Sequence, residues 1–147
     1  SVHQGSITAF YTVLTEGDDL QDPIADAARA ILDGHIVLSR HLADAGHYPA
    51  IDVEASISRV MPQVVAPEHD QAARSIKRVY STFQQNKDLI NIGAYVKGSD
   101  AQIELSIAAA PAIDAFLQQG MKQVLDMKAS TETMQTLASG IQAVNKG

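Results

Sequence analysis

An arginine behind a Ser-x-Ser triplet is the residue of this sequence best suited to chemistry. Arg59 follows residues 56–58 at the end of a short extended segment. Its guanidinium is a planar, permanently charged fork of N–H groups that matches the oxygens of a phosphate or a carboxylate. The structural alternative is an ion pair with Asp52 or Glu54, and composition alone favours that alternative.

Two other groups carry weaker signals. Tyr48 precedes Pro49, which fixes the backbone beside an aromatic ring, and core packing is the plain explanation of this pair. Asp18, Asp19 and Asp22 gather in an acidic loop ahead of a predicted helix. These carboxylates either contact a partner or simply stabilise the positive N-terminal end of the helix.

Other catalytic motifs are missing from the sequence. It holds no cysteine, no Gly-rich loop ending in Lys-Ser or Lys-Thr, no nucleophile elbow and no His pair at metal-ligand spacing on a helix. Four histidines are scattered, and we expect each on the surface or at a strand end: His35, His41, His47 and His69. We therefore predict no metal site within this chain.

Charge and composition narrow the class of partner. The net charge is −6, and residues 1–65 hold nine acidic against three basic side chains, whereas residues 66–147 hold eight of each. Binding to nucleic acid needs clustered Lys and Arg, which the first part lacks. A basic protein partner or a solvated acidic surface fits better. No apolar run approaches the roughly 20 residues of a spanning helix, so we expect membrane contact to be peripheral at most.

The first half alternates strand and helix signals. Residues 6–14, rich in β-branched and aromatic side chains, predict a strand buried on both faces of a parallel sheet. Pro23 suits the first turn of a helix that the preceding aspartate caps and that Gly34 ends. A short strand at 36–39 and a short helix stopped at Gly46 follow. This order predicts an α/β layer.

The second half changes to long helices beyond a boundary at residues 62–67. An apolar stripe at three- and four-residue spacing predicts a helix of about six turns, broken at 93–100. A second helix carries Pro111 in its interior, which predicts a kink or a broken pair of helices. A weaker third helix spans 131–144. The stripe positions of the two longer helices are Ile76, Val79, Tyr80, Phe83, Leu89, Ile90, Ile103, Ile107, Ala110, Ile113, Phe116 and Leu117.

The chain begins at Ser1, without an initiator Met and within a few residues of the first predicted strand. We expect it to be a fragment whose N-terminal core is missing. The change of pattern assigns residues 1–65 to an α/β part and residues 66–147 to a small helical bundle.

Four blocks of this sequence closely resemble the rotary ATPase superfamily, which includes the catalytic subunits of ATP synthase and the type III secretion ATPases. The blocks are GSITAFYTVLTEGDDLQDPIAD (5–26), ILDGHIVLSR (31–40), GHYPAIDVEASISRVMP (46–62) and NIGAYVKGSD (91–100). The last block and the helix before it look more like the flagellar export ATPase than its virulence-secretion relatives. The similarity fades after Met121.

That resemblance implies the C-terminal part of a RecA-like P-loop core, followed by a small all-α bundle, in a homohexamer that hydrolyses ATP with Mg²⁺. The phosphate loop, the Walker B aspartate and the catalytic glutamate would lie before Ser1, as would the Mg²⁺ ligands, so we expect the fragment alone to be inactive. In the family, the arginine of the S-x-S-R motif reaches across the subunit interface to the γ-phosphate. The resemblance therefore implies that Arg59 is an arginine finger.

The resemblance also implies an adenine pocket. Tyr48 matches the tyrosine of the YPA motif, which stacks on the adenine held by its own subunit. Phe116 aligns with one aromatic residue of the opposite wall, and Met121 stands where the ATP synthase subunit has the second. A thioether still packs on a ring, though less rigidly. Met121 and the loop at 96–99 separate this chain from the ATP synthase catalytic subunit.

The acidic loop of Asp18, Asp19 and Asp22 resembles the segment that contacts the central stalk in ATP synthase. The flagellar counterpart of the stalk is a coiled-coil export protein, which would also touch the helical tip at 95–100. The implied setting is the cytoplasmic face of the export apparatus, beside export-gate components. The alternative function is a non-catalytic interaction module that binds such a stalk-like protein through the acidic loop and the helical tip.

Overall fold

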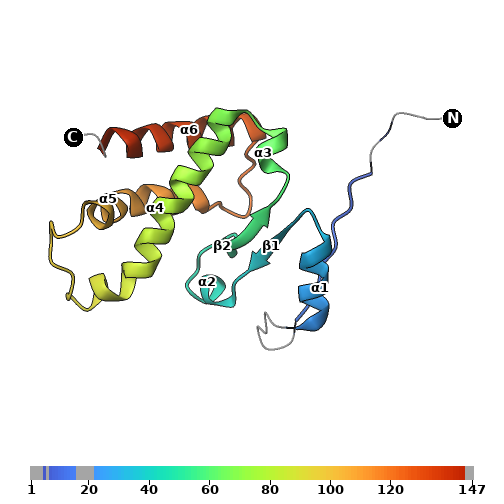
Figure 1. Ribbon diagram of the computed structural model, residues 1–147, viewed down its shortest axis with the longest axis horizontal. Coiled ribbons are helices and arrows are strands. Elements are labelled where there is room, and N and C mark those ends of the chain that lie inside the picture. Colours follow the sequence, from blue (N-terminus) through green and yellow to red (C-terminus); the bar gives the residue numbers. More distant parts are fainter. Residues whose placement is uncertain (1–4, 6, 16–21, 145–147) are drawn as a thin grey trace. The chain divides into compact units, whose positions relative to one another are not determined.

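The structure, a computed structural model, describes residues 5, 7–15 and 22–144 (Figure 1). The chain divides into two units, Ser1–Leu32 and Asp33–Gly147. Helix α1, Pro23–Ile31, belongs to the first unit and begins as predicted. Asp22 Oδ1 accepts hydrogen bonds from the N–H groups of Ile24 (2.8 Å) and Ala25 (3.0 Å). Pro23 occupies the first turn, where its missing N–H costs no helical hydrogen bond.

The strand predicted at residues 6–14 is wrong for the part that the structure describes. Residues 7–14 form neither helix nor strand, and Ile7 and Leu14 are 98% and 91% exposed. A strand persists only when a neighbouring strand takes up its backbone hydrogen bonds. Within the described residues, strand pairing is confined to a sheet of two strands elsewhere in the chain.

That sheet opens the second unit. Strands β1 (Gly34–Leu38) and β2 (Ile51–Ser58) pair antiparallel, with Gly34 opposite Ser58. The register is irregular between His35 and Val37. The described strands therefore form a small antiparallel sheet and not the parallel one expected around 6–14.

Gly34 has a different role from the predicted helix stop. Helix α1 already ends at Ile31, and Gly34 is the first residue of β1. A Cβ atom on Gly34 would lie 2.5 Å from the carbonyl oxygen of Ile57. The close approach of two strand backbones explains this glycine.

Helix α2, Arg40–Asp44, lies between the two strands, as the sequence predicts. Ser39 Oγ caps it by accepting a hydrogen bond from the N–H of Leu42 (3.3 Å). Gly46 then turns the chain with a φ of 74°, a conformation that favours glycine.

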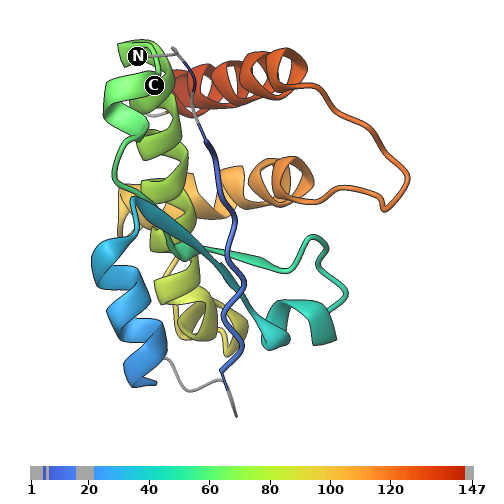
Figure 2. The ribbon, with the colours of Figure 1, turned by 90° about the vertical axis from the view of Figure 1, so that its right-hand side faces the viewer.

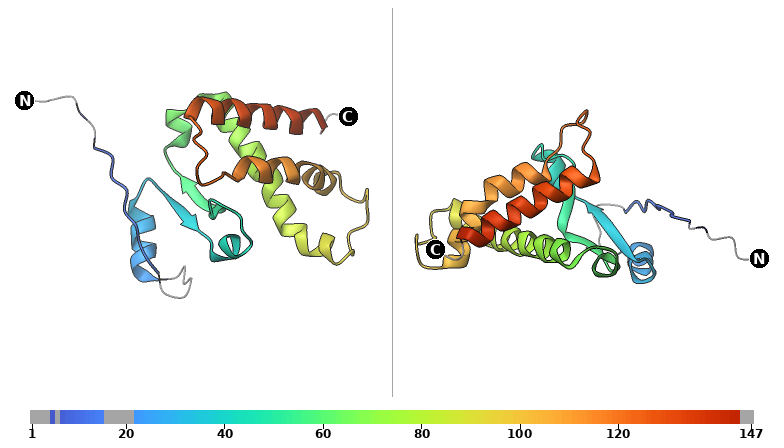
Figure 3. Two further views of the ribbon diagram at one scale, coloured as in Figure 1. Left: turned by 180° about the vertical axis from the view of Figure 1, so that it is seen from behind. Right: turned by 90° about the horizontal axis from the view of Figure 1, so that it is seen from above.

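Helices α3 (Met61–Val64), α4 (Pro67–Asn91), α5 (Ala101–Leu117) and α6 (Met127–Val144) complete the second unit. The three long ones pack on one another (Figure 2, Figure 3). Their core consists of Ala72, Ile76, Val79, Tyr80, Leu105, Ala109, Ile113, Met134, Ala138 and Ile141. These buried positions confirm the predicted apolar stripe through the middle of α4.

None of the described helices is long and apolar enough to cross a bilayer.

Two helices differ in detail from their predictions. Helix α5 continues through Pro111 and does not divide there into a pair, because buried residues on both sides hold it against the core. Helix α6 begins at Met127, four residues before the predicted Thr131, and Asp126 Oδ1 accepts a hydrogen bond from the N–H of Ala129 (2.6 Å). Its Ser and Thr hydroxyls donate to carbonyl oxygens four residues earlier, which satisfies these polar groups within the helix.

Candidate functional site

An open hollow of about 630 Å³ lies where the loop after α2 meets the loop after α5. We call it the Tyr48 hollow, and its lining residues are Gly46, Tyr48, Pro49, Gln118, Gln119, Gly120 and Met121. Small-molecule pockets occupy roughly 300 to 1,000 Å³. The hollow is therefore large enough for a ligand of the size of a nucleoside.

Hydrogen bonds between and within the two loops fix the wall of the hollow. The N–H of Gln119 donates to the carbonyl oxygen of Tyr48 (2.9 Å), which ties the end of α5 to the chain ahead of β2. Gln119 Nε2 donates to the carbonyl oxygen of Gln123 (2.6 Å), and the N–H of Gly120 donates to Gln123 Oε1 (3.2 Å). Gln118 also lines the hollow, and a glutamine side chain carries both a hydrogen-bond donor and an acceptor.

Tyr48 and Met121, two of the three residues predicted to hold the adenine base, both line this hollow. Tyr48 is 56% exposed and Met121 is fully exposed. Phe116 is half-buried, packs against the helical core and is not among the lining residues. It follows Ile113 by three residues on the apolar stripe of α5, so the sequence already contained the signal for core packing.

No pattern in the sequence predicts the two glutamines of the lining, Gln118 and Gln119. Polar residues directly after a helix show no periodicity, and an exposed glutamine is ordinary on a protein surface. The hydrogen bond from the Gln119 N–H to the Tyr48 carbonyl oxygen joins the loop after α5 to the loop that carries Tyr48, and the two glutamines line the same hollow as Tyr48.

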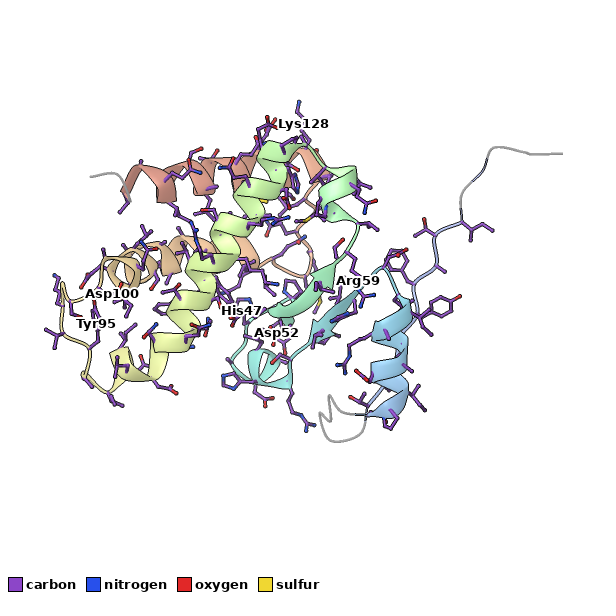
Figure 4. The ribbon with its side chains drawn as sticks, viewed as in Figure 1. His47, Asp52, Arg59, Tyr95, Asp100 and Lys128 are labelled. Atoms are coloured by element: carbon purple, nitrogen blue, oxygen red, sulfur yellow. The ribbon has the colours of Figure 1, made fainter. Side chains whose placement is uncertain are left out.

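Arg59 lies directly after β2 (Figure 4). It is not among the residues that line the Tyr48 hollow. Its N–H donates to the carbonyl oxygen of Asp33 (2.8 Å), so its backbone is fixed beside the start of β1. The residue as a whole is exposed. Arg59 therefore lies at the surface of the unit, on a backbone that this hydrogen bond fixes.

The two carboxylates suggested as structural partners of Arg59 also accept hydrogen bonds from nearby groups. Asp52 Oδ1 accepts hydrogen bonds from the N–H groups of Glu54 and Ala55 (2.9 Å each). Glu54 Oε1 accepts a hydrogen bond from Ser81 Oγ (2.5 Å). Both carboxylates therefore serve the local structure around β2 and α4.

The acidic loop is described only at its last member. Asp18 and Asp19 lie outside the described residues, whereas Asp22 caps α1. Asp22 therefore has the structural role that was the alternative to partner contact for this loop, because its carboxylate stabilises the N-terminal end of α1.

Comparison with known proteins settles the family. The ATP synthase alpha/beta family nucleotide-binding domain matches residues 1–58, and the T3SS EscN ATPase C-terminal domain matches residues 65–136. The flagellum-specific ATP synthase of Pseudomonas aeruginosa is 58% identical over 139 residues, which is 95% of this chain and 31% of that protein. The chain belongs to the flagellar and type III secretion ATPase family.

Solved structures of this ATPase family share the fold. The assembled ATPase EscN of the enteropathogenic E. coli type III secretion system matches 91% of this chain and 32% of its own, with a TM-score of 0.86 and 44% identity. EscN in complex with its central stalk EscO matches 79% of this chain and 29% of its own, with a TM-score of 0.74 and 40% identity. The chain thus has the α/β segment and helical C-terminal domain of the family, and it spans about a third of the length of these relatives.

The loop between α4 and α5, residues 92–100, is the second surface that the family resemblance singles out, and we call it the tip loop. The hydroxyl of Tyr95 (3.1 Å) and the N–H of Gly98 (2.6 Å) both donate to Glu104 Oε1. Asp100 Oδ1 accepts from the N–H of Gln102 (2.7 Å) and so begins α5. These bonds give the loop a defined conformation.

Apolar side chains lie exposed on the tip loop. Ile92 is 77% exposed and Val96 is 70% exposed. Figure 4 places Tyr95 and Asp100 of this loop well away from Arg59. The ATPase family member thus presents two separate surfaces on one unit, a charged one after β2 and an apolar one at the tip loop.

Electrostatics in this unit are unusual at Tyr80 of α4. Burial raises the pKa of the Tyr80 hydroxyl above its ordinary value of 10.0, and the charges of Asp114, Glu54 and Asp52 raise this pKa further. A hydrogen bond with Gln84 acts in the opposite direction and lowers the pKa.

In the part of the chain that the structure describes, no three His, Asp or Glu side chains gather closely enough to hold a metal ion.

Proposed function

We propose that this chain is the C-terminal part of an ATPase that energises flagellar protein export by hydrolysing ATP. The 58% identity to a flagellum-specific ATP synthase supports this function. Residues 1–65 would complete a RecA-like core and residues 66–147 would form the helical domain, with the two family matches separated between residues 58 and 65. The phosphate loop and the Mg²⁺ ligands would come from outside this chain, which covers 31% of the flagellar relative.

The observation that carries the proposal is the exposed Arg59 on a backbone fixed directly after β2. In phosphoryl transfer a protein mainly positions groups and neutralises the charge on the transferred phosphoryl oxygens. A guanidinium fork suits that task. The EscN relative has been solved as an assembled ATPase. In a homohexamer of the full-length protein, Arg59 would act on the ATP of the neighbouring subunit.

The Tyr48 hollow would hold the base of the nucleotide bound by its own subunit. The exposed Tyr48 ring supplies a stacking surface, and Met121 supplies a polarizable side chain beside it. Phe116 would act on this pocket indirectly, through the α5 core in which it packs. The amide of Gln118 adds a polar group to the same wall.

ATP turnover by the full-length protein tests this function. We expect Arg59→Ala to lower turnover by about 10³- to 10⁵-fold, the general range for loss of an arginine finger, while nucleotide binding is retained. Arg59→Lys should remain slow, because a lysine lacks the planar fork. Arg74→Ala is the matched control, since Arg74 pairs with Asp70 at the surface of α4 (2.8 Å). Wild-type turnover in Arg59→Ala contradicts the proposal.

A second candidate function is binding to a stalk-like coiled-coil export protein, and with it contact with export-gate components at the cytoplasmic face of the apparatus. The defined tip loop with its exposed Ile92 and Val96 favours this role, as does the EscN relative solved with its stalk EscO. The acidic loop of Asp18, Asp19 and Asp22 would supply complementary charge to a basic partner.

Matched variants separate the two surfaces of this second function. A triple variant removes the negative charge of the acidic loop and keeps a capping side chain for α1, since asparagine also caps helices; its substitutions are Asp18→Asn, Asp19→Asn and Asp22→Asn. In Ile92→Ser with Val96→Ser, the apolar tip is lost. We expect both sets to weaken binding of the purified stalk protein in a titration, and unchanged affinity in both sets would contradict a partner role.

A further inference from the structure

Helix α4 contacts strand β2 at two polar points. Lys77 Nζ donates to the carbonyl oxygen of Ser56 (3.1 Å), and Ser81 Oγ donates to Glu54 Oε1 (2.5 Å). Lys77 and Ser81 are four residues apart, about 6 Å along a helix axis. Glu54 and Ser56 are two residues apart, about 6.6 Å along a strand. Because these spacings match, both contacts form at once and fix the position of α4 along β2.

Ser56 joins α4 to both strands of the sheet. Its carbonyl oxygen accepts from Lys77, and its hydroxyl donates to the carbonyl oxygen of Asp52 (2.5 Å). The same hydroxyl accepts from the N–H of Val37 (2.9 Å), at the irregular register of β1. A shift of Ser56 would therefore break bonds to the helix, to β2 and to β1.

The backbone between Ser56 and Arg59 is held at both ends. Lys77 holds the Ser56 carbonyl, and the Asp33 carbonyl holds the Arg59 N–H three residues later. A hydrogen bond from an ammonium group is roughly twice as strong as one between neutral groups. Lys77 is half-buried in this contact and does not extend freely into solvent.

We infer that Lys77 is a positioning residue for Arg59, an inference that rests on the role proposed above for Arg59. Lys77 does not touch the nucleotide. It holds the end of β2 in the position from which the guanidinium meets a neighbouring subunit's γ-phosphate. Because α4 continues from Lys77 to the tip loop, the same contact links the position of Arg59 to the helical domain.

Steady-state ATP turnover by the full-length protein tests the inference. Lys77→Met removes the ammonium and keeps most of the aliphatic stem. We expect kcat to fall about tenfold with the KM for ATP unchanged, because displacing a reacting group by about 1 Å costs up to about 100-fold. Lys77→Arg should restore most of kcat, since it returns a charged donor. Lys87→Met removes the same charge from an exposed site on the same helix and should turn over ATP like the wild type.

A double variant distinguishes positioning from a general effect on structure. If Lys77 acts through Arg59, Lys77→Met should cause no further loss in the Arg59→Ala background. An equal loss in both backgrounds, or a fall in kcat that Lys77→Arg does not restore, overturns the inference. If Lys77→Met has the kcat of the wild type while Arg59→Ala is slow, only the inference about Lys77 is overturned. If Arg59→Ala itself has the kcat of the wild type, the proposed function is overturned as well. If Lys77→Met does not fold, Lys77→Gln takes its place, and failure of both to fold assigns Lys77 a structural role and overturns the inference.

Discussion

Tyr48 is a large aromatic residue that remains more than half exposed beside a hollow of ligand size. If its ring stacks on the base of a nucleotide, Tyr48→Ala in the full-length protein should weaken nucleotide binding by about 1 to 3 kcal/mol. Titration with a fluorescent ATP analogue measures the loss. Tyr48→Phe keeps the ring and should bind like the wild type, and equal affinity in all three proteins would exclude stacking.

Tyr80 predicts a pH dependence of stability. Its pKa is raised in the folded protein by burial and by the nearby carboxylates, so the unfolded chain loses this proton at lower pH than the folded one. The stabilising contribution is fully present below pH 10, the ordinary pKa of tyrosine, and is lost as the pH rises through the folded pKa. The free energy of unfolding should therefore fall above pH 10.

Denaturant unfolding at a series of alkaline pH values measures this effect. Tyr80→Phe removes the titrating hydroxyl, and its stability should decline less steeply over the same range than that of the wild type. Equal slopes for the two proteins would show that Tyr80 does not contribute to the alkaline loss.

Single residues also show what the sequence could reveal. The cap at Asp22 and the glycine turn at Gly46 depend on neighbours within a few positions, and the structure confirms both. Phe116 packs against the α5 core, as its helical spacing after Ile113 indicates, and its contact with a base stays a prediction. The Tyr48 hollow depends on two loops some 70 residues apart, a distance that no local pattern spans.

At the scale of elements, Glu104 holds the tip loop through bonds to Tyr95 and Gly98. Glu104→Ala should release the Gly98 N–H and speed its hydrogen exchange, because an amide without an intramolecular partner is open to solvent. Exchange of the core amides of α4 should not change. Hydrogen exchange with mass spectrometry measures both regions, and unaltered exchange at residues 93–100 would show that Glu104 does not hold the loop.

Elements also differ in how far the sequence predicts them. The stripe of α4 repeats over many turns, so the pattern predicted both its type and its buried side. Residues 6–14 have the composition of a strand, but composition does not provide the neighbouring strand that the backbone requires. The local sequence predicts a helix stop at Gly34, because the approach of β2 depends on residues more than 20 positions away.

At the scale of the whole molecule, α4 connects the two surfaces of the second unit. Its middle holds β2 through Lys77 and Ser81, and its end leads into the tip loop. A change at a nucleotide beside Arg59 would therefore reach the tip loop along one continuous helix. Under the functions proposed above, hydrolysis and contact with a stalk would be coupled, because each surface would bias the position of the same helix.

The central claim is that Arg59 acts across a subunit interface, and complementation tests it most directly. Full-length Arg59→Ala subunits, which keep their own phosphate loop, are mixed with subunits that lack the phosphate-loop lysine and keep Arg59. Each kind of subunit alone should be inactive, and mixed rings should regain ATP turnover, because an intact site forms wherever a subunit with a phosphate loop lies beside one with Arg59. Mixed rings that assemble but stay as inactive as either parent would contradict the account.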